Sequence, residues 1–404
     1  PHRTLEEAFW GADFLMRMQD PAGYFYTTVF DQWSKMPGER MICSFKTKQG
    51  HRLTDYQAGF RQGGGMAIAA LARASRVSSC PETHGEYTAD EYRLAAVRAY
   101  DHLKQHNTEY LDNGRENIID YYCALMAAVE LFMTTSDDSY LHDARYRADQ
   151  LMALFSSWKG HWIVEEDSSR PFFHASDEGL PLVALVKYCN VEPDADLRKA
   201  AAEFTGEVCS AILLNTDNAY NPFNLARRWV QPAGSSPAAE IRISFFIPHE
   251  NETGYWWQGE NANLASLAAA FRMAAQLFRR ENISNEADVL DAMKNFADSQ
   301  LNWILGMNPF DICMLQGRGR NNPKYEEFYP NAPGGICNGI TAGFLDESDI
   351  DFLPETIQWR GDHRWRWSEQ WIPHAAWFLL ASAADMQPLK SIGDGRQDGK
   401  QNGK

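Results

Sequence analysis

A single carboxylate, Glu369, lies in a stretch crowded with tryptophan. The stretch RWRWSEQWIPHAAWFLL, residues 364–380, places Glu369 among four tryptophans just ahead of an apolar helical run. In an extended segment alternate side chains point to opposite faces, so Trp365, Trp367 and Glu369 would share one face. Apolar surroundings raise the pKa of a carboxyl, because its charged form is poorly solvated there. The pattern predicts a carboxylic acid that stays protonated near neutrality, as a general acid must be.

An ion pair is the competing interpretation of Glu369. Arg364 and Arg366 flank it, and a nearby guanidinium lowers the pKa of a carboxyl. In the extended arrangement both arginines would lie on the other face, so desolvation of Glu369 would dominate. Pro373 suits the first position of a helix and leaves Glu369 in the loop ahead of it.

Further aromatic residues gather beside the expected starts of helices, with polar side chains close by in sequence. A sugar ring stacks its C–H face on a flat aromatic surface, while its hydroxyls need hydrogen-bond donors and acceptors. Each tryptophan taken alone can equally be part of the core. The residues concerned are Tyr255, Trp256, Trp257, Trp359, Trp365, Trp367 and Trp371, near Glu252, Gln258, Glu260, Arg360, Asp362 and His363.

The bulk properties of the chain limit the classes of function. With 404 residues, of which 44% are hydrophobic, the chain can bury a large core, and no run of eighteen apolar residues suggests a membrane span. A formal charge of -16 without a basic stripe argues against binding nucleic acid or an anionic membrane. Seven cysteines without a CxxC pair indicate neither a disulfide framework nor a zinc site. A reduced, cytoplasmic location is therefore expected.

Helices are expected along most of the chain, because apolar residues recur at helical spacing in ten segments. Thr4 with Glu7 forms an apparent capping box, and Asp194 and Ser284 stand at N-cap positions. The sequence predicts one catalytic domain over residues 1–390 and a flexible tail over 391–404. The helical segments are 4–18, 58–75, 88–106, 117–134, 139–156, 178–190, 194–213, 261–279, 285–305 and 373–386.

Several stretches together resemble glycoside hydrolase family 9, which contains cellulases and some exo-acting glucosaminidases. SQLNWILGMNP (299–309) is similar to the family's most specific string, and SEQWIPHAAWFLLASA (368–383) is similar to the segment that carries its catalytic acid. The other matching stretches are LEEAFWGADFLMRMQDPAGYFY (5–26), YYCALMAAVELFMTTSDDSYL (121–141) and YWWQGENANLASLAAAF (255–271).

The resemblance implies an all-α fold, an (α/α)6 barrel of helical hairpins, and inverting hydrolysis of β-1,4 bonds between gluco-configured sugars. Glu369 matches the family's proton donor by position. Inversion also needs a carboxylate base about 6.5–9.5 Å from the acid. The family carries this base in an Asp-Ala-Gly-Asp stretch that the chain lacks. We therefore expect the base upstream of Pro1. We expect an N-terminal helix there as well, because the predicted helices are too few for such a barrel.

Departures from the family pattern bear on the substrate. The stretch 316–335 replaces the family's usual PHHR loop, so Arg318 and Arg320 become the candidates for contacting sugar hydroxyls. Pro373 and His374 replace an Asp-Tyr pair. With these changes the chain resembles the branch of the family that acts on short oligosaccharides, including exo-β-glucosaminidases. The ammonium group of an amino-sugar substrate would need an acidic partner.

FHASDEG (173–179) supplies a candidate for that acidic partner. The alternative is that these acids only complement the dipole at a helix N-terminus. Besides the catalytic Glu369, the predicted substrate-binding residues are Trp256, Trp257, Arg318, Arg320, Trp365, His374, His174, Asp177 and Glu178.

Two other function classes remain open. A non-catalytic carbohydrate-binding relative could keep the cleft without the base. A helical-barrel polysaccharide lyase would need a Tyr or His base and a basic cleft, which the acidic composition disfavours. We expect an oligosaccharide as partner and no catalytic cofactor, although some relatives hold structural calcium. The pattern of TTSDDSYLHD (134–143) favours a turn into a helix over a calcium loop, and Asp137 would be the cap of that helix.

Overall fold

The computed structural model describes most of the chain, which clusters into two compact units. Unit 1 is Pro1–Ala153 and unit 2 is Leu154–Lys404, where the sequence predicts one domain over 1–390. Of Trp365 only the backbone is described. The described residues are 2–31, 34–43, 55–77, 84–157, 159–166, 169–174, 176–232, 241–248, 259–283, 287–323, 332–342, 350–352 and 365–384.

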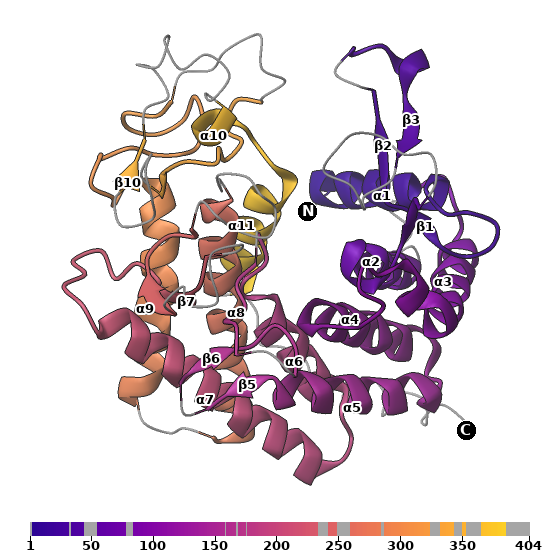
Figure 1. Cartoon of the computed structure of the whole chain (residues 1–404), viewed down its shortest axis with the longest axis horizontal. Coiled ribbons are helices and arrows are strands. Elements are labelled where there is room, and N and C mark those ends of the chain that lie inside the picture. The colour runs from indigo at the N-terminus through magenta and orange to yellow at the C-terminus, as the bar shows by residue number, and fades with distance from the viewer. Residues whose placement is uncertain are drawn as a thin grey trace, which may run out of the picture. The chain divides into compact units, whose positions relative to one another are not determined.

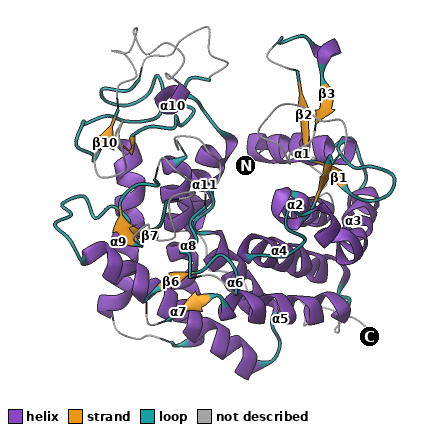
Figure 2. Ribbon diagram, in the orientation of Figure 1, coloured by secondary structure: helices purple, strands orange, loops and turns teal. Residues whose placement is uncertain are grey.

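Unit 1 is built from five helices with short strands between them (Figures 1 and 2). Helix α2 packs on α3 and α4, and α4 packs on α5. Val29 pairs with Ile42 in the β2–β3 hairpin. The helices are α1 (His2–Arg17), α2 (Gly64–Val77), α3 (Ala89–Tyr110), α4 (Ile118–Thr135) and α5 (Asp138–Ala153). The strands are β1 (Phe25–Tyr26), β2 (Thr28–Phe30), β3 (Met41–Cys43) and β4 (Gln57–Ala58), and two 3-10 turns cover Pro37–Glu39 and Phe60–Gln62.

Unit 2 is centred on α8, which packs against α6, α7, α9 and α11 (Figure 1). Its strands form three short antiparallel pairs. The helices are α6 (Leu180–Val191), α7 (Ala195–Asp217), α8 (Glu260–Glu281), α9 (Ala287–Leu305), α10 (Trp365–Ser368) and α11 (Ile372–Ala384). The strands are β5 (Phe155–Ser156), β6 (His161–Trp162), β7 (Arg228–Val230), β8 (Arg242–Ser244), β9 (Thr341–Ala342) and β10 (Ile350–Asp351).

The ten helices predicted from apolar spacing all form, with ends shifted by a few residues, and α10 is an additional helix in the described chain. Asp194 caps α7 as predicted, accepting from the backbone N–H groups of Asp196 and Leu197. Asp137 accepts from Ser139 N at 2.9 Å, just ahead of α5. The capping box predicted at Thr4 is wrong, because α1 already includes His2 and Thr4 lies inside it. Ser284 and the tail 391–404 lie outside the described residues.

Helix α4 is the most apolar long helix in the described part of the chain. By length and composition alone it could cross a membrane, but 67% of its eighteen residues, Ile118–Thr135, are buried inside the structure. A core helix between two neighbours needs apolar residues on more than one side. The burial of α4 between α2 and α5 therefore accounts for its composition.

Contact between α2 and α4 depends on a glycine. A Cβ atom on Gly65 would lie 2.7 Å from the backbone oxygen of Cys123 in α4, so the two helices can approach only because Gly65 has no side chain.

We expect Gly65→Ala to lower the free energy of unfolding by about 1–3 kcal/mol, because the two helices would have to move apart. Gly11→Ala in α1 is the matched control, since its Cβ would meet nothing within 4 Å and alanine favours a helix. Urea unfolding of both variants measures the difference. Equal stability of the two variants would contradict this explanation of Gly65.

Candidate active site

Glu369 lies in the connection between α10 and α11. Residues 365–368 form a helical turn, so the predicted extended segment with alternating faces is wrong. The consecutive side chains of Arg366 and Trp367 are both fully buried, which an extended segment with one exposed face cannot achieve. Glu369 itself is half-buried. Its Oε2 accepts a hydrogen bond from Nε1 of Trp371 at 2.7 Å.

The alternative ion pair of Glu369 with Arg366 is not formed in the described structure. The guanidinium of Arg366 donates to the backbone oxygen of Ala342 at 3.2 Å and lies 4.6 Å from the centre of the Trp367 ring. Arg364, the other candidate partner, falls outside the described residues. The carboxyl of Glu369 is therefore held by an indole and not by Arg366.

The backbone around Glu369 is fixed by a neighbouring loop. Asn338 N donates to Glu369 O at 2.8 Å, and Gly339 N donates to Trp367 O at 3.0 Å. Gly339 has φ +79°, and a Cβ there would lie 2.5 Å from Nδ2 of Asn261. Only glycine fits this close approach in a left-handed conformation.

Gln370 ties the same segment to a neighbouring stretch that contains Gln316 and Ala332. Its side-chain amide donates to Oε1 of Gln316 at 2.9 Å and to Ala332 O at 2.9 Å, and its oxygen accepts from Ala332 N. A Cβ on Gly335 would lie 2.3 Å from this amide oxygen. The loop and the Glu369 segment are thus joined side by side.

The first two turns of α8 carry four buried polar side chains that bind the surrounding loops. Oε1 of Glu260 accepts from Ile247 N at 3.2 Å, and Nδ2 of Asn261 donates to Cys337 O at 2.8 Å. Asn263 donates to His174 O at 2.9 Å and accepts from Glu178 N at 3.3 Å. Ser266 Oγ accepts from Gly179 N at 2.9 Å. We call Glu260, Asn261, Asn263 and Ser266 the α8 polar turn.

A buried ion cluster lies beside this turn. The guanidinium of Arg228 contacts Oε2 of Glu178 at 2.9 Å and Oε2 of Glu260 at 2.7 Å. Burial raises the pKa of Glu178, and the positive charge of Arg228 only partly opposes that effect. Glu178, which the sequence predicts to bind the substrate, is instead paired with Arg228.

Asp177 and His174 lie next to the cluster and are more accessible. The side chain of Asp177 is 28% exposed, and its Oδ1 accepts from Nε1 of Trp377 in α11 at 2.6 Å. Nδ1 of His174 accepts from the backbone N–H of Ser176 and of Asp177, and burial lowers its pKa. A histidine that accepts through Nδ1 is neutral, so His174 supplies no positive charge to pair with Asp177.

The remaining predicted binding residues fall in different places. Arg318 is exposed, and Arg320, 79% exposed, pairs with Asp311 at 2.6 Å. His374 is fully buried and cannot face a ligand in this conformation. Trp256 and Trp257 lie outside the described residues, as does the side chain of Trp365.

The roles of several residues of the site were not predicted from the sequence. The indole N–H groups of Trp371 and Trp377 hold the two candidate carboxyls, but a tryptophan's spacing does not reveal its hydrogen-bond partner. Asn261, Asn338 and Gln370 carry no motif of their own. Their roles depend on loops that meet only after folding.

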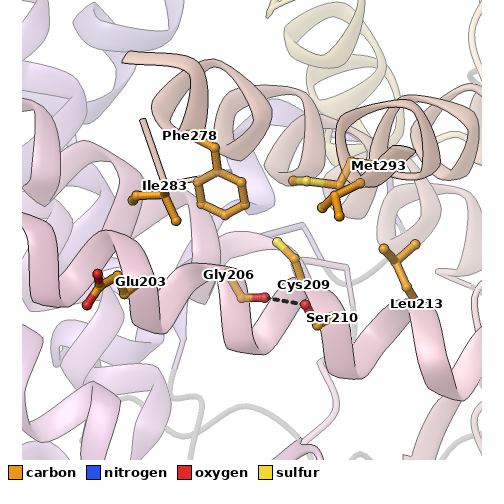
Figure 3. Close-up of a pocket in the computed structure, with 9 residues that line it drawn as sticks. Glu203, Gly206, Cys209, Ser210, Leu213, Phe278, Ile283 and Met293 are labelled. Carbon is orange, nitrogen blue, oxygen red and sulfur yellow. Dashed lines mark hydrogen bonds between the residues drawn. The ribbon is translucent and has the colours of Figure 1, made fainter. Parts of the chain in front are cut away.

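Neither a metal-ligand group nor the cavity between α7, α8 and α9 adds to this site in the described part of the chain. Across the described ranges, no group of three or more His, Cys, Asp or Glu side chains could hold a metal ion. A cavity of about 280 Å³ between α7, α8 and α9 is lined mainly by apolar side chains such as Leu213, Phe278 and Met293 (Figure 3). Phe278 is near the opposite end of α8, about 18 Å along the helix from Ser266 at 1.5 Å per residue. This cavity is therefore separate from Glu369.

The comparisons with known proteins agree with the predicted family. The model of glycosyl hydrolase family 9 matches residues 1–327. No curated protein matches the chain.

Solved structures of similar fold cover nearly the whole chain. "Bacteroides ovatus GH9" has a TM-score of 0.51 at 17% identity over 93% of this chain and 61% of its own. Endoglucanase CelQ from Clostridium thermocellum, complexed with cellotriose, has a TM-score of 0.54 and 14% identity. The match covers 97% of this chain and 58% of CelQ. The endoglucanase from the termite Nasutitermes takasagoensis has a TM-score of 0.53 at 14% identity over 93% and 76%.

These likenesses show the fold, and the predicted all-α, (α/α)6 class is confirmed. The chain spans about three fifths of the length of the first structures that it matches.

Removing the positive charge of the ion cluster should destabilise the protein. In Arg228→Met two buried carboxylates lose their partner, and we expect a loss of about 3–5 kcal/mol. Part of the loss should return as the pH falls from 7 towards 4.5, the ordinary pKa of glutamate, because protonating Glu178 removes the unpaired charge.

Thermal unfolding at several pH values measures this effect. Arg320→Met, which breaks an exposed pair of unit 2, should leave the melting temperature nearly unchanged. A pH-independent loss in Arg228→Met would rule out the charge explanation.

Proposed function

This chain belongs to glycosyl hydrolase family 9, and from that premise we propose that it hydrolyses β-1,4 bonds in gluco-configured oligosaccharides with inversion. Glu369 is the proton donor. The observation that supports the proposal is the geometry of the carboxyl of Glu369, the residue that the resemblance assigns as the family's proton donor. Oε2 is held by Trp371, whereas Oε1 has no hydrogen-bond partner in the described part of the chain. A half-buried carboxyl with one oxygen free can reach a leaving-group oxygen.

Inverting hydrolysis needs two carboxyl groups. The acid protonates the glycosidic oxygen while a base activates a water on the other face of the sugar, about 6.5–9.5 Å away. The base predicted upstream of Pro1 stays a prediction. In this proposal the described residues supply the acid, Glu369, and a carboxylate for binding the sugar, Asp177.

The substrate class is supported by the ligands of similar structures. Two structures of endoglucanase CelQ are complexed with cellotriose and cellotetraose. Both are chains of β-1,4-linked glucose, and we propose the same linkage for this protein's substrate.

An amino sugar is the finer proposal. Asp177 is partly exposed beside a neutral His174, and the Trp377 N–H fixes its orientation. A carboxylate in this setting can pair with the ammonium group of a glucosamine residue. Glu178, already paired with Arg228, is assigned to holding the loop.

Glu369→Gln tests the assignment of the acid. Glutamine keeps the shape of the side chain but cannot donate the proton, so kcat on cello-oligosaccharides should fall about 10²–10⁴-fold. Product analysis of the full-length protein by chromatography gives the rate.

Exposed Glu166→Gln provides the control for the same chemical change, and it should keep the wild-type rate. If Glu369→Gln is as active as the wild type, the assignment is wrong. Sugar binding without any turnover by the wild type would instead identify a non-catalytic relative, and an unsaturated product would identify a lyase.

Asp177→Asn tests the amino-sugar proposal. Loss of the negative charge should raise KM for chitosan oligosaccharides about 10-fold, roughly the 1.4 kcal/mol of a charge-assisted contact. KM for cello-oligosaccharides should change little, because they carry no ammonium group. An equal change on both substrates would show that Asp177 does not recognise charge.

A further inference from the structure

We propose that Trp371, clamped by His374, is a positioning residue that determines which oxygen of Glu369 carries the transferred proton. The inference rests on the proposed function, because it concerns the same carboxyl. It starts from the contact between Nε1 of Trp371 and Oε2 of Glu369, 2.7 Å long.

The indole N–H can only donate a hydrogen bond. Oε2 must therefore act as an acceptor whether the carboxyl is protonated or ionised. In the protonated form the carbonyl oxygen is the stronger acceptor, so the contact favours the hydrogen on the other oxygen, Oε1, which no described residue binds. The contact thus directs the acidic O–H away from Trp371 and leaves it for the substrate.

The same contact also favours the product of proton transfer. Once Glu369 has given its proton away, Oε2 carries part of a negative charge, and a hydrogen bond to an ionised group is stronger than one to a neutral group. The bond therefore tightens as the proton leaves.

Trp371 can do this only if its ring is held still, and His374 supplies that restraint. The two rings stack with centres 5.7 Å apart and planes at 23°. Nδ1 of His374 accepts from the backbone N–H of Trp371 at 3.1 Å, and His374 N donates to Trp371 O at 3.2 Å. Both the ring and the backbone of Trp371 are thereby fixed.

His374 pays a desolvation cost for this position. It is fully buried, its Nε2 has no partner among the described residues, and burial lowers its pKa to about 3. It is therefore neutral in this conformation, as an acceptor through Nδ1 must be. An apolar residue would avoid the cost of burying an imidazole but would lose the Nδ1 contact.

Trp371→Phe removes the N–H but keeps an aromatic ring to stack on His374. We compare kcat on two cellobiosides with the full-length protein. One has an alkyl leaving group that needs protonation, and the other has a 2,4-dinitrophenyl group that leaves without it. The expected result is a loss of about 10–100-fold on the alkyl cellobioside, within the range of general-acid catalysis, and little change on the dinitrophenyl one or in either KM.

Two further variants complete the experiment. Trp303→Phe is the matched control, because Trp303 lies in the core of α9 and its Nε1 has no partner in the described structure. It should keep the wild-type rates on both substrates. His374→Phe keeps the stack but loses the Nδ1 acceptor, and should reproduce the selective loss of Trp371→Phe to a smaller extent.

The outcomes separate this proposal from the proposed function. Equal losses on both substrates, or an unchanged rate in Trp371→Phe while Glu369→Gln is inactive, would overturn the positioning role and leave the acid assignment standing. An active Glu369→Gln would overturn the acid assignment itself.

Discussion

The arrangement of unit 2 depends on a buried turn of polar side chains at the start of α8. A helix N-terminus leaves backbone N–H groups unpaired and usually faces water. Here its side chains are turned to other loops instead. Asn263 and Ser266 hold the loop that bears Asp177, and Asn261 holds the loop whose next residues bind the Glu369 backbone. Loops without regular structure thereby gain fixed positions.

This turn explains why carboxylates of similar sequence context have different roles. Glu178 and Asp177 are neighbours, but Arg228 approaches only Glu178, and it also neutralises Glu260. Buried carboxylates with one shared cation are stable only while that cation stays. Asp177 receives an indole N–H in place of a full positive charge, so its own charge is not cancelled. One residue of the pair stabilises the loop, and the other can bind a ligand.

Sequence reasoning predicted the helices well, because apolar spacing is a local property. It failed where local rules compete. The stretch 365–368 alternates tryptophan with polar residues and reads as extended, yet it turns because Arg366 and Trp367 are both buried. A buried arginine on an indole face cannot be foreseen from the chain alone.

The candidate site was predictable in part for the same reason. The choice of Glu369 as a candidate acid followed from its motif, whereas its contacts with Asn338 and Trp371 required the folded loops. The Glu178–Arg228 pair joins residues fifty positions apart in the chain. No spacing rule connects them, so the sequence could not divide the roles of Asp177 and Glu178.

Two buried imidazoles in the described part of unit 2 also limit the pH range over which the fold persists. Burial lowers the pKa of His161 to about 4 and that of His374 to about 3, from an ordinary value of 6.5. As the pH falls below 6.5, these histidines become protonated in the unfolded chain but stay neutral in the native chain until the pH reaches their lowered pKa values. Acid therefore favours unfolding. Acid tolerance in this protein is therefore restricted by buried imidazoles, and replacing His161, which takes no part in the proposed reaction, would move that boundary.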